Sequence, residues 1–89
     1  MNIEYHIQVW QEGKQFVAHA MPLDVMSSGS TPDQARYSLY EAVELFLETA
    51  SEMGTLQEIL QESGYERKRG SWIVPRWVAM ERHSSAVAT

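Results

Sequence analysis

The sequence predicts a single α+β domain with a three-stranded antiparallel sheet, one long helix packed on one sheet face, a short second helix, and an irregular C-terminal tail with one or two further strand segments. Three observations support this class. Apolar and polar residues alternate along two neighbouring segments early in the chain, which is the period of half-buried strands. Apolar residues then recur every three or four positions over residues 32–53, the period of an amphipathic helix. The length of 89 residues suits one domain.

The first two predicted strands form a hairpin. Residues 3–10 and 15–21 alternate in hydrophobicity, and Gly13 lies between them, where a tight turn needs a residue that tolerates positive φ. A turn centred immediately before Gly13 places Val9 opposite Phe16, and one face of the hairpin is then uniformly apolar. We therefore expect this face to pack in the core.

The remaining elements follow from capping signals. A short third strand is expected at 25–28, and Thr31 followed by Pro32 marks the start of the long helix, which ends at Gly54. A capping-box pattern predicts the short second helix within 55–64. The predicted core consists of Ile3, Tyr5, Ile7, Val9, Phe16, Ala18, Leu39, Val43, Phe46, Ala50, Ile59 and Leu60.

Charge is unevenly distributed along the chain. The formal net charge is −5, but residues 1–64 hold two basic and ten acidic residues, or −8, whereas residues 65–89 hold five basic and two acidic residues, or +3. The overall balance excludes a domain that coats nucleic acid or an anionic membrane, and no apolar run approaches the length of a membrane span. The absence of cysteine excludes disulfides, thiolate zinc sites and cysteine catalysis, and fits a reducing compartment such as the cytoplasm.

A stripe of glutamates on the long helix is the strongest candidate for a binding surface. The four glutamates recur at intervals of three or four residues, opposite the apolar stripe, and two large apolar residues share their side. A solvated helix face is the alternative explanation. Because no basic residue relieves the repulsion within the stripe, a basic protein partner is our preferred interpretation. The predicted partner-binding face consists of Tyr37, Glu41, Glu44, Leu45, Glu48 and Glu52.

Two histidines are weak candidates for metal or acid–base chemistry. The predicted hairpin register places His6 directly opposite His19, close enough to share a metal or a proton, with Glu4 or His83 as the only third ligand. Two ligands do not make a zinc site, and the sequence holds no phosphate loop, serine elbow or zinc-protease motif. We therefore predict no enzyme, no cofactor and no metal, and keep a small metal- or histidine-dependent nuclease as an alternative.

The tail over 65–89 combines basic residues with tryptophans. Such a mixture occurs in single-strand nucleic-acid binders, but the acidic body would repel phosphate. We expect this tail to pack on the domain at 1–64 or on a neighbouring subunit, and we do not expect this chain alone to bind nucleic acid. A chain this short buries a modest share of its surface, so a homodimer or homotetramer is predicted. The candidate oligomer-interface residues are Trp10, Val17, Met21, Trp72 and Trp77.

Several of these residues match a known family pattern over 3–64. The matching positions are Tyr5, Ile7, Val9, Gly13, Phe16, Val17 and Ala18 in the hairpin, then Ser27-x-Gly29-x-Thr31-Pro32, Ala35, Leu39, Glu41-Ala42, Phe46-Leu47-Glu48 and Gly54. With them the chain resembles the HicB-like antitoxins of bacterial type II toxin–antitoxin systems. The resemblance implies a partial ribonuclease-H-like fold and a HicA-type partner, a small basic toxin that cleaves mRNA and is silenced when the antitoxin covers its RNA-binding surface.

The sequence departs from that family in two places. The usual Pro-Asp-Leu-Pro-Gly stretch is replaced by Ala20-Met21-Pro22-Leu23-Asp24, and residues 65–89 carry no two-helix pattern of the C-terminal DNA-binding domain found in many members. The family's DNA binding is therefore not carried over. An orphan oligomeric scaffold without a toxin stays open as an alternative.

Overall fold

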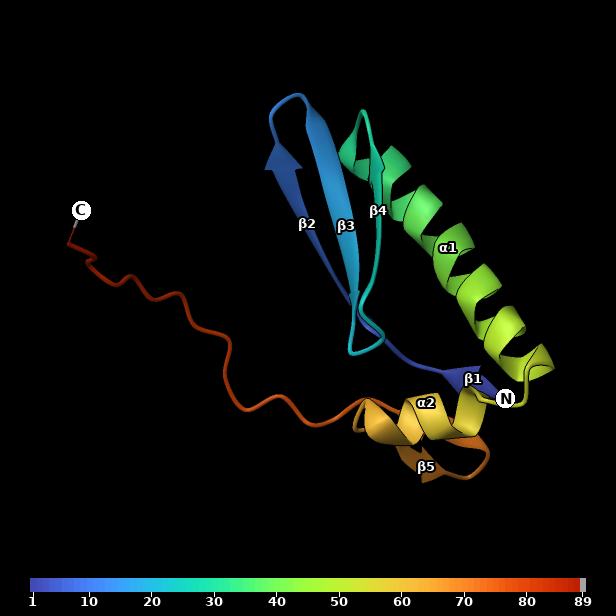
Figure 1. Ribbon diagram of the computed structural model, residues 1–89. Helices are drawn as coiled ribbons and strands as arrows, with labels where there is room; N and C mark the ends of the chain where they lie inside the picture. The colour runs from blue at the N-terminus through green and yellow to red at the C-terminus, as the bar shows by residue number, and fades with distance from the viewer. Residues whose placement is uncertain (89) are drawn as a thin grey trace.

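The computed structural model describes residues 1–88 and confirms the α+β class, with the three-stranded antiparallel sheet, the long helix and the short second helix (Figure 1). Thr89, the last residue of the predicted tail, lies outside the described residues. The elements in chain order are β1 (Asn2–Ile3), β2 (His6–Glu12), β3 (Gln15–Met21), β4 (Val25–Gly29), α1 (Pro32–Glu52), α2 (Leu56–Glu62), β5 (Glu66–Lys68) and β6 (Ser71–Ile73).

The main sheet has the strand order β2-β3-β4, and its hairpin register differs from the predicted one. Glu12 pairs with Gln15, so Gly13, at φ 60°, and Lys14 form the turn. As a result Val9 lies opposite Ala18, and the predicted pairing of Val9 with Phe16 is wrong by two residues. Side chains alternate with a period of two, so this shift leaves the apolar face of the hairpin toward the core.

Helix α1 covers one face of this sheet (Figure 1). Its start follows the predicted signals, since the Thr31 side chain accepts a hydrogen bond of 3.0 Å from the Gln34 amide and Pro32 occupies the first turn. The helix approaches β4 very closely, because a Cβ built on Gly29 would lie 2.7 Å from the backbone nitrogen of Ala35. Glycine at this position therefore permits the packing of α1 on β4.

Helix α2 departs from its predicted cap. The Thr55 side chain makes no capping bond to α2, and its hydroxyl instead donates to the Ala50 carbonyl at 3.4 Å, so the predicted capping box is wrong. Leu60 is fully buried as predicted, whereas Ile59 is only half-buried. The neighbouring Ala50 is buried in the last turns of α1.

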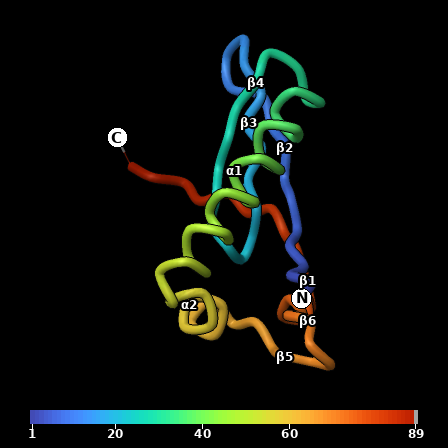
Figure 2. Tube along the Cα trace, turned by 90° about the vertical axis from the view of Figure 1, so that its right-hand side faces the viewer, coloured from blue at the N-terminus to red at the C-terminus, as the bar shows by residue number. Residues whose placement is uncertain are grey.

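A second sheet, with strand order β1-β6-β5, lies at the end of the molecule where α1 ends and α2 begins (Figures 1 and 2). In it β1 pairs in parallel with β6, and the β5–β6 turn uses Arg69 and Gly70 at positive φ. Tyr65 and Trp72 are buried in the core, at 5% and 3% exposure, although neither was among the predicted core residues. Residues 74–88 form neither helix nor strand, and the exposed part after Pro75 leaves the body of the molecule (Figure 1).

Among residues 1–88, neither helix combines the length and the apolar character that crossing a membrane requires. Helix α1 is long enough, but it carries Asp33, Arg36 and four glutamates.

Candidate functional site

The outer side of α1 carries the predicted partner-binding face. The helix buries Ala35, Leu39 and Val43 against the sheet, so residues half a turn away point to solvent. All six predicted residues are exposed on that side, and they extend along about 22 Å of helix from the first to the last of them. They are Tyr37, Glu41, Glu44, Leu45, Glu48 and Glu52, and we call this surface the acidic face.

No basic side chain neutralises the acidic face within the part of the chain that the structure describes. The single basic residue of α1, Arg36, pairs with Asp33 at 2.8 Å, and no ion pair involves a glutamate of the acidic face. Glutamates four residues apart on a helix destabilise it by about 0.2–0.5 kcal/mol per pair. Glu48 and Glu52 also lie near the negative end of the helix dipole, where carboxylates are unfavourable. Repulsion between the glutamates and their position near the C-terminus of the helix therefore both destabilise α1.

Two large side chains interrupt the charge. Tyr37 is 66% exposed and Leu45 is 65% exposed, so each offers apolar contact area beside carboxylates. The pKa of the half-buried Tyr5 is raised by burial, then by Tyr40, and then by the carboxylate of Glu44, so the acidic face also affects a residue that packs on the core. An acidic surface with exposed aromatic and aliphatic side chains is chemically suited to a basic protein surface.

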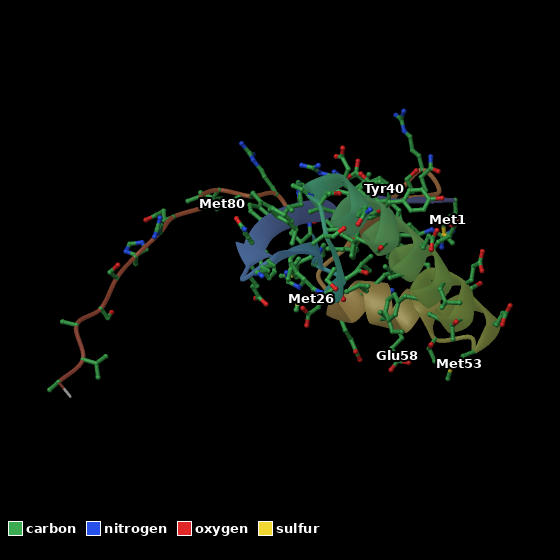
Figure 3. All side chains as sticks on the ribbon, turned by 90° about the horizontal axis from the view of Figure 1, so that it is seen from above. Met1, Met26, Tyr40, Met53, Glu58 and Met80 are labelled. Atoms are coloured by element: carbon green, nitrogen blue, oxygen red, sulfur yellow. The ribbon has the colours of Figure 1, made fainter. Side chains whose placement is uncertain are left out.

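An apolar groove of about 420 Å³ runs along the acidic face, between α1 and α2, and the sequence reasoning did not find it. Its apolar lining is Ala42, Leu45, Phe46, Ala50, Met53 and Ile59. Figure 3 shows that Met53 and Glu58 point to the same side of the molecule, while Tyr40 points to the opposite side of α1. The position of Leu45 outside the buried stripe was available from the sequence, but the periodicity of α1 does not give the position of α2, which forms the other side of the groove.

The predicted contact between His6 and His19 is wrong. The observed register pairs His6 with Met21 and Gln8 with His19, which leaves the histidines as diagonal neighbours. Each has another partner, since the His6 ring lies 4.8 Å from the Trp77 ring and His19 Nε2 lies 2.6 Å from Asp24 Oδ1.

The proposed third ligands also lie elsewhere. Glu4 Oε1 accepts a hydrogen bond of 3.3 Å from the Val74 amide, and His83 contacts Glu81 at 3.0 Å in the tail. Within residues 1–88 no three His, Asp or Glu side chains are grouped so that they could hold a metal ion. The structure therefore gives the histidines no shared metal or acid–base geometry.

The candidate oligomer-interface residues fall in three places. Trp10, Val17 and Met21 are half-buried on the sheet face that α1 does not cover. Trp77 is 41% exposed at the start of the tail, against His6 of that same face. Trp72 is only 3% exposed because it packs in the core, so its side chain is not available to a second subunit.

Comparisons with known proteins give no match, whether with family models, curated proteins or solved structures. The surfaces of the chain itself therefore carry the functional inference. The most distinctive of them are the acidic face of α1 and the apolar groove that borders it.

Proposed function

We propose that this protein is an antitoxin-like binding module. In this proposal it neutralises a small basic ribonuclease of the HicA type by covering the toxin's RNA-binding surface with the acidic face. The observation that carries the proposal is the row of four glutamates on the outer side of α1, none of which forms an ion pair within residues 1–88. The resemblance of residues 3–64 to HicB-like antitoxins supplies the type of partner.

The energetics of the acidic face favour a binding role over simple solvation. A helix that needs only solubility gains from alternating charges, which form favourable pairs, whereas this helix retains repelling ones. The repulsion is relieved when a basic surface docks. An RNA-binding surface is basic because it must neutralise phosphates, so a row of carboxylates is complementary to it and competes directly with RNA.

Tyr37 and Leu45 would act as the apolar anchors of this contact. Interfaces draw most of their free energy from a few large side chains that become desolvated, while charges at the rim govern the association rate and its dependence on salt. Both residues are exposed and stand among the glutamates. We therefore expect a complex that forms rapidly at low salt.

Charge reversal on the acidic face tests the proposal. The first step is to ask whether the neighbouring reading frame encodes a small basic protein, which is then co-expressed with this chain and assayed for RNA cleavage. In the variant Glu44→Lys/Glu48→Lys, affinity should fall about tenfold or more at low salt, salt dependence should weaken, and inhibition of RNA cleavage should be lost. The matched control Glu12→Lys/Glu62→Lys makes the same charge change outside α1 and should change affinity less than about threefold.

Two results would contradict the proposal. One is equal affinity for the charge-reversed variant, its control and the wild type in titration calorimetry. The other is the absence of a co-purifying basic protein, which would favour the alternative of an orphan oligomeric scaffold. The nuclease alternative has lost the direct contact between His6 and His19 on which it rested.

A homo-oligomer remains part of the proposal. A domain of this size gains stability by association. Exposed apolar surface at the groove and along the tail supports self-association.

A further inference from the structure

Six of the ten large apolar side chains that are exposed within residues 1–88 lie on two surfaces, and the other four are Met1, Met26, Tyr37 and Tyr40. Leu45 and Met53, at 65% and 71% exposure, belong to the apolar groove between α1 and α2. The other group lies after Pro75, in the exposed part of the C-terminal tail, and consists of Trp77, Val78, Met80 and Val87. Each surface lacks a covering partner within residues 1–88.

The tail has the chemistry of a docking segment. Residues 76–88 are exposed and extend away from the body (Figures 1 and 2). Val78, at 94% exposure, and Met80, at 71%, belong to the apolar run 77–80, which Arg76 precedes and Glu81 and Arg82 follow, so residues 76–82 carry two positive charges and one negative charge. Thirteen residues can span about 43 Å when extended, which is ample for a contact with another molecule.

The groove has the complementary chemistry. Its floor is apolar, and its borders are acidic on both helices. On α1, Glu41 lies one turn before Leu45 and Glu52 adjoins Met53, whereas on α2 Glu58 adjoins the groove residue Ile59. Helix α2 has no basic residue, and the one basic residue of α1 is paired with Asp33. An apolar segment with flanking arginines therefore satisfies both the floor and the borders.

We propose that the apolar groove of one copy binds the C-terminal tail of a second copy, with Val78 and Met80 on the groove floor and Arg76 and Arg82 against the bordering glutamates. The exchange is reciprocal, so two identical contacts form a closed two-fold dimer. This interface shares Leu45, Glu41 and Glu52 with the acidic face, so a docked tail and a docked toxin would exclude one another there, but its tests use this protein alone, without a toxin. Their outcome is therefore separate from that of the antitoxin proposal.

The path of the tail favours a second copy over the tail's own groove. The segment leaves the body beside the end of α2, where Pro75 approaches Gly64, and Trp77 then packs on His6. His6 belongs to the sheet face opposite α1, because its neighbours Tyr5 and Ile7 are the residues that pack toward the core. The tail therefore starts on one side of the sheet while its own groove lies on the other.

Three exposed methionines provide matched variants. Met53→Glu places a charge in the groove, Met80→Glu places one in the tail, and Met26→Glu, at a site 55% exposed on β4, is the control. In sedimentation equilibrium the wild type should be a dimer, the first two variants should raise the dimer Kd about ten- to hundredfold, and the control should leave it unchanged. A wild type that stays monomeric at several hundred micromolar, or a control that weakens the dimer as much as the others, would overturn the proposal.

Introduced cysteines identify the contact itself, since the native chain has none. Chains carrying Thr49→Cys in the groove are mixed with chains carrying Ala79→Cys in the tail under mild oxidation. The mixed disulfide should form much faster than one between Ala79→Cys and Ser28→Cys, which lies on β4 outside the groove. Equal rates, or a Thr49→Cys/Ala79→Cys double variant that closes within a single monomer, would contradict exchange between copies.

Discussion

Alkaline pH should destabilise this protein through one buried tyrosine. Tyr65 is 5% exposed, its hydroxyl donates a hydrogen bond to the Glu4 carbonyl, and its pKa is raised to about 12. Burial is the largest cause, followed by the carboxylate of Glu4 and by Tyr5. The unfolded chain releases this proton near pH 10, whereas the folded protein retains it to about pH 12.

The sign and size of the effect follow from this difference. Between pH 10 and pH 12 the folded state binds more protons, so the stabilisation is fully present below pH 10 and is lost as the pH rises. A displacement of two pKa units corresponds to at most about 2.7 kcal/mol in the free energy of unfolding, of which about 1.4 kcal/mol is lost at pH 11. Tyr5 adds to the loss with the same sign, because its pKa is also raised, first by burial.

Urea unfolding at pH 8 and pH 11, followed by circular dichroism, measures this effect. At pH 8 the variant Tyr65→Phe should be about 1 kcal/mol less stable than the wild type, because it lacks the hydrogen bond to Glu4. At pH 11 the difference should shrink to about zero, because only the wild type has lost the contribution of Tyr65. The control Tyr37→Phe, at a site 66% exposed, should follow the wild type at both values. A gap between wild type and Tyr65→Phe that is equal at the two pH values would refute the reasoning.

Two further substitutions test the packing and capping of α1 by thermal or urea unfolding. Gly29→Ala should lower the free energy of unfolding by about 1–3 kcal/mol, because its Cβ would lie 2.7 Å from the Ala35 nitrogen and the backbone must move. The control Ser28→Ala, at the exposed neighbouring position, should lower it by less than about 0.5 kcal/mol. Equal losses for the two variants would show that the close approach of α1 to β4 does not limit the packing. Thr31→Ala should cost about 1 kcal/mol because its side chain accepts a bond of 3.0 Å from a helix amide, and Thr55→Ala should cost clearly less because its hydroxyl makes no cap. The reverse order would contradict the observed caps.

The hairpin shows which features of a sheet can be predicted from hydrophobic patterning and which cannot. Alternation in residues 3–10 and 15–21 predicts which side chains face the core, and the structure agrees. The pattern does not distinguish two registers that differ by two residues, because both keep the same faces inward. The turn at Gly13 and Lys14 selects between the two registers. In the selected register His6 and His19 are not directly opposite each other.

The acidic face could be predicted from the sequence of one helix, whereas the groove could not. A stripe on one helix follows from the 3.6-residue period, so its six residues could be located from the sequence and are exposed as expected. The groove requires two helices at a particular separation and angle, which no single helix encodes. Ile59 illustrates this difference, since its apolar character predicted burial but its place on α2 directs it into the groove.

The sequence by itself established the α+β class, the limits of the long helix, the acidic character of its outer side and the reversal of charge after residue 64, because each is a local property of neighbouring residues. The sequence predicted one or two strand segments in the tail, but their assembly with β1 into a second sheet depends on tertiary structure. Strands of two or three residues are too short to show a hydrophobic period. Strand β1 pairs with β6 from the other end of the chain. Trp72 is buried in this region, and the Tyr65 hydroxyl donates a hydrogen bond to the Glu4 carbonyl. Such pairings depend on which surfaces the main sheet and helices leave open, and that is a property of the assembled fold.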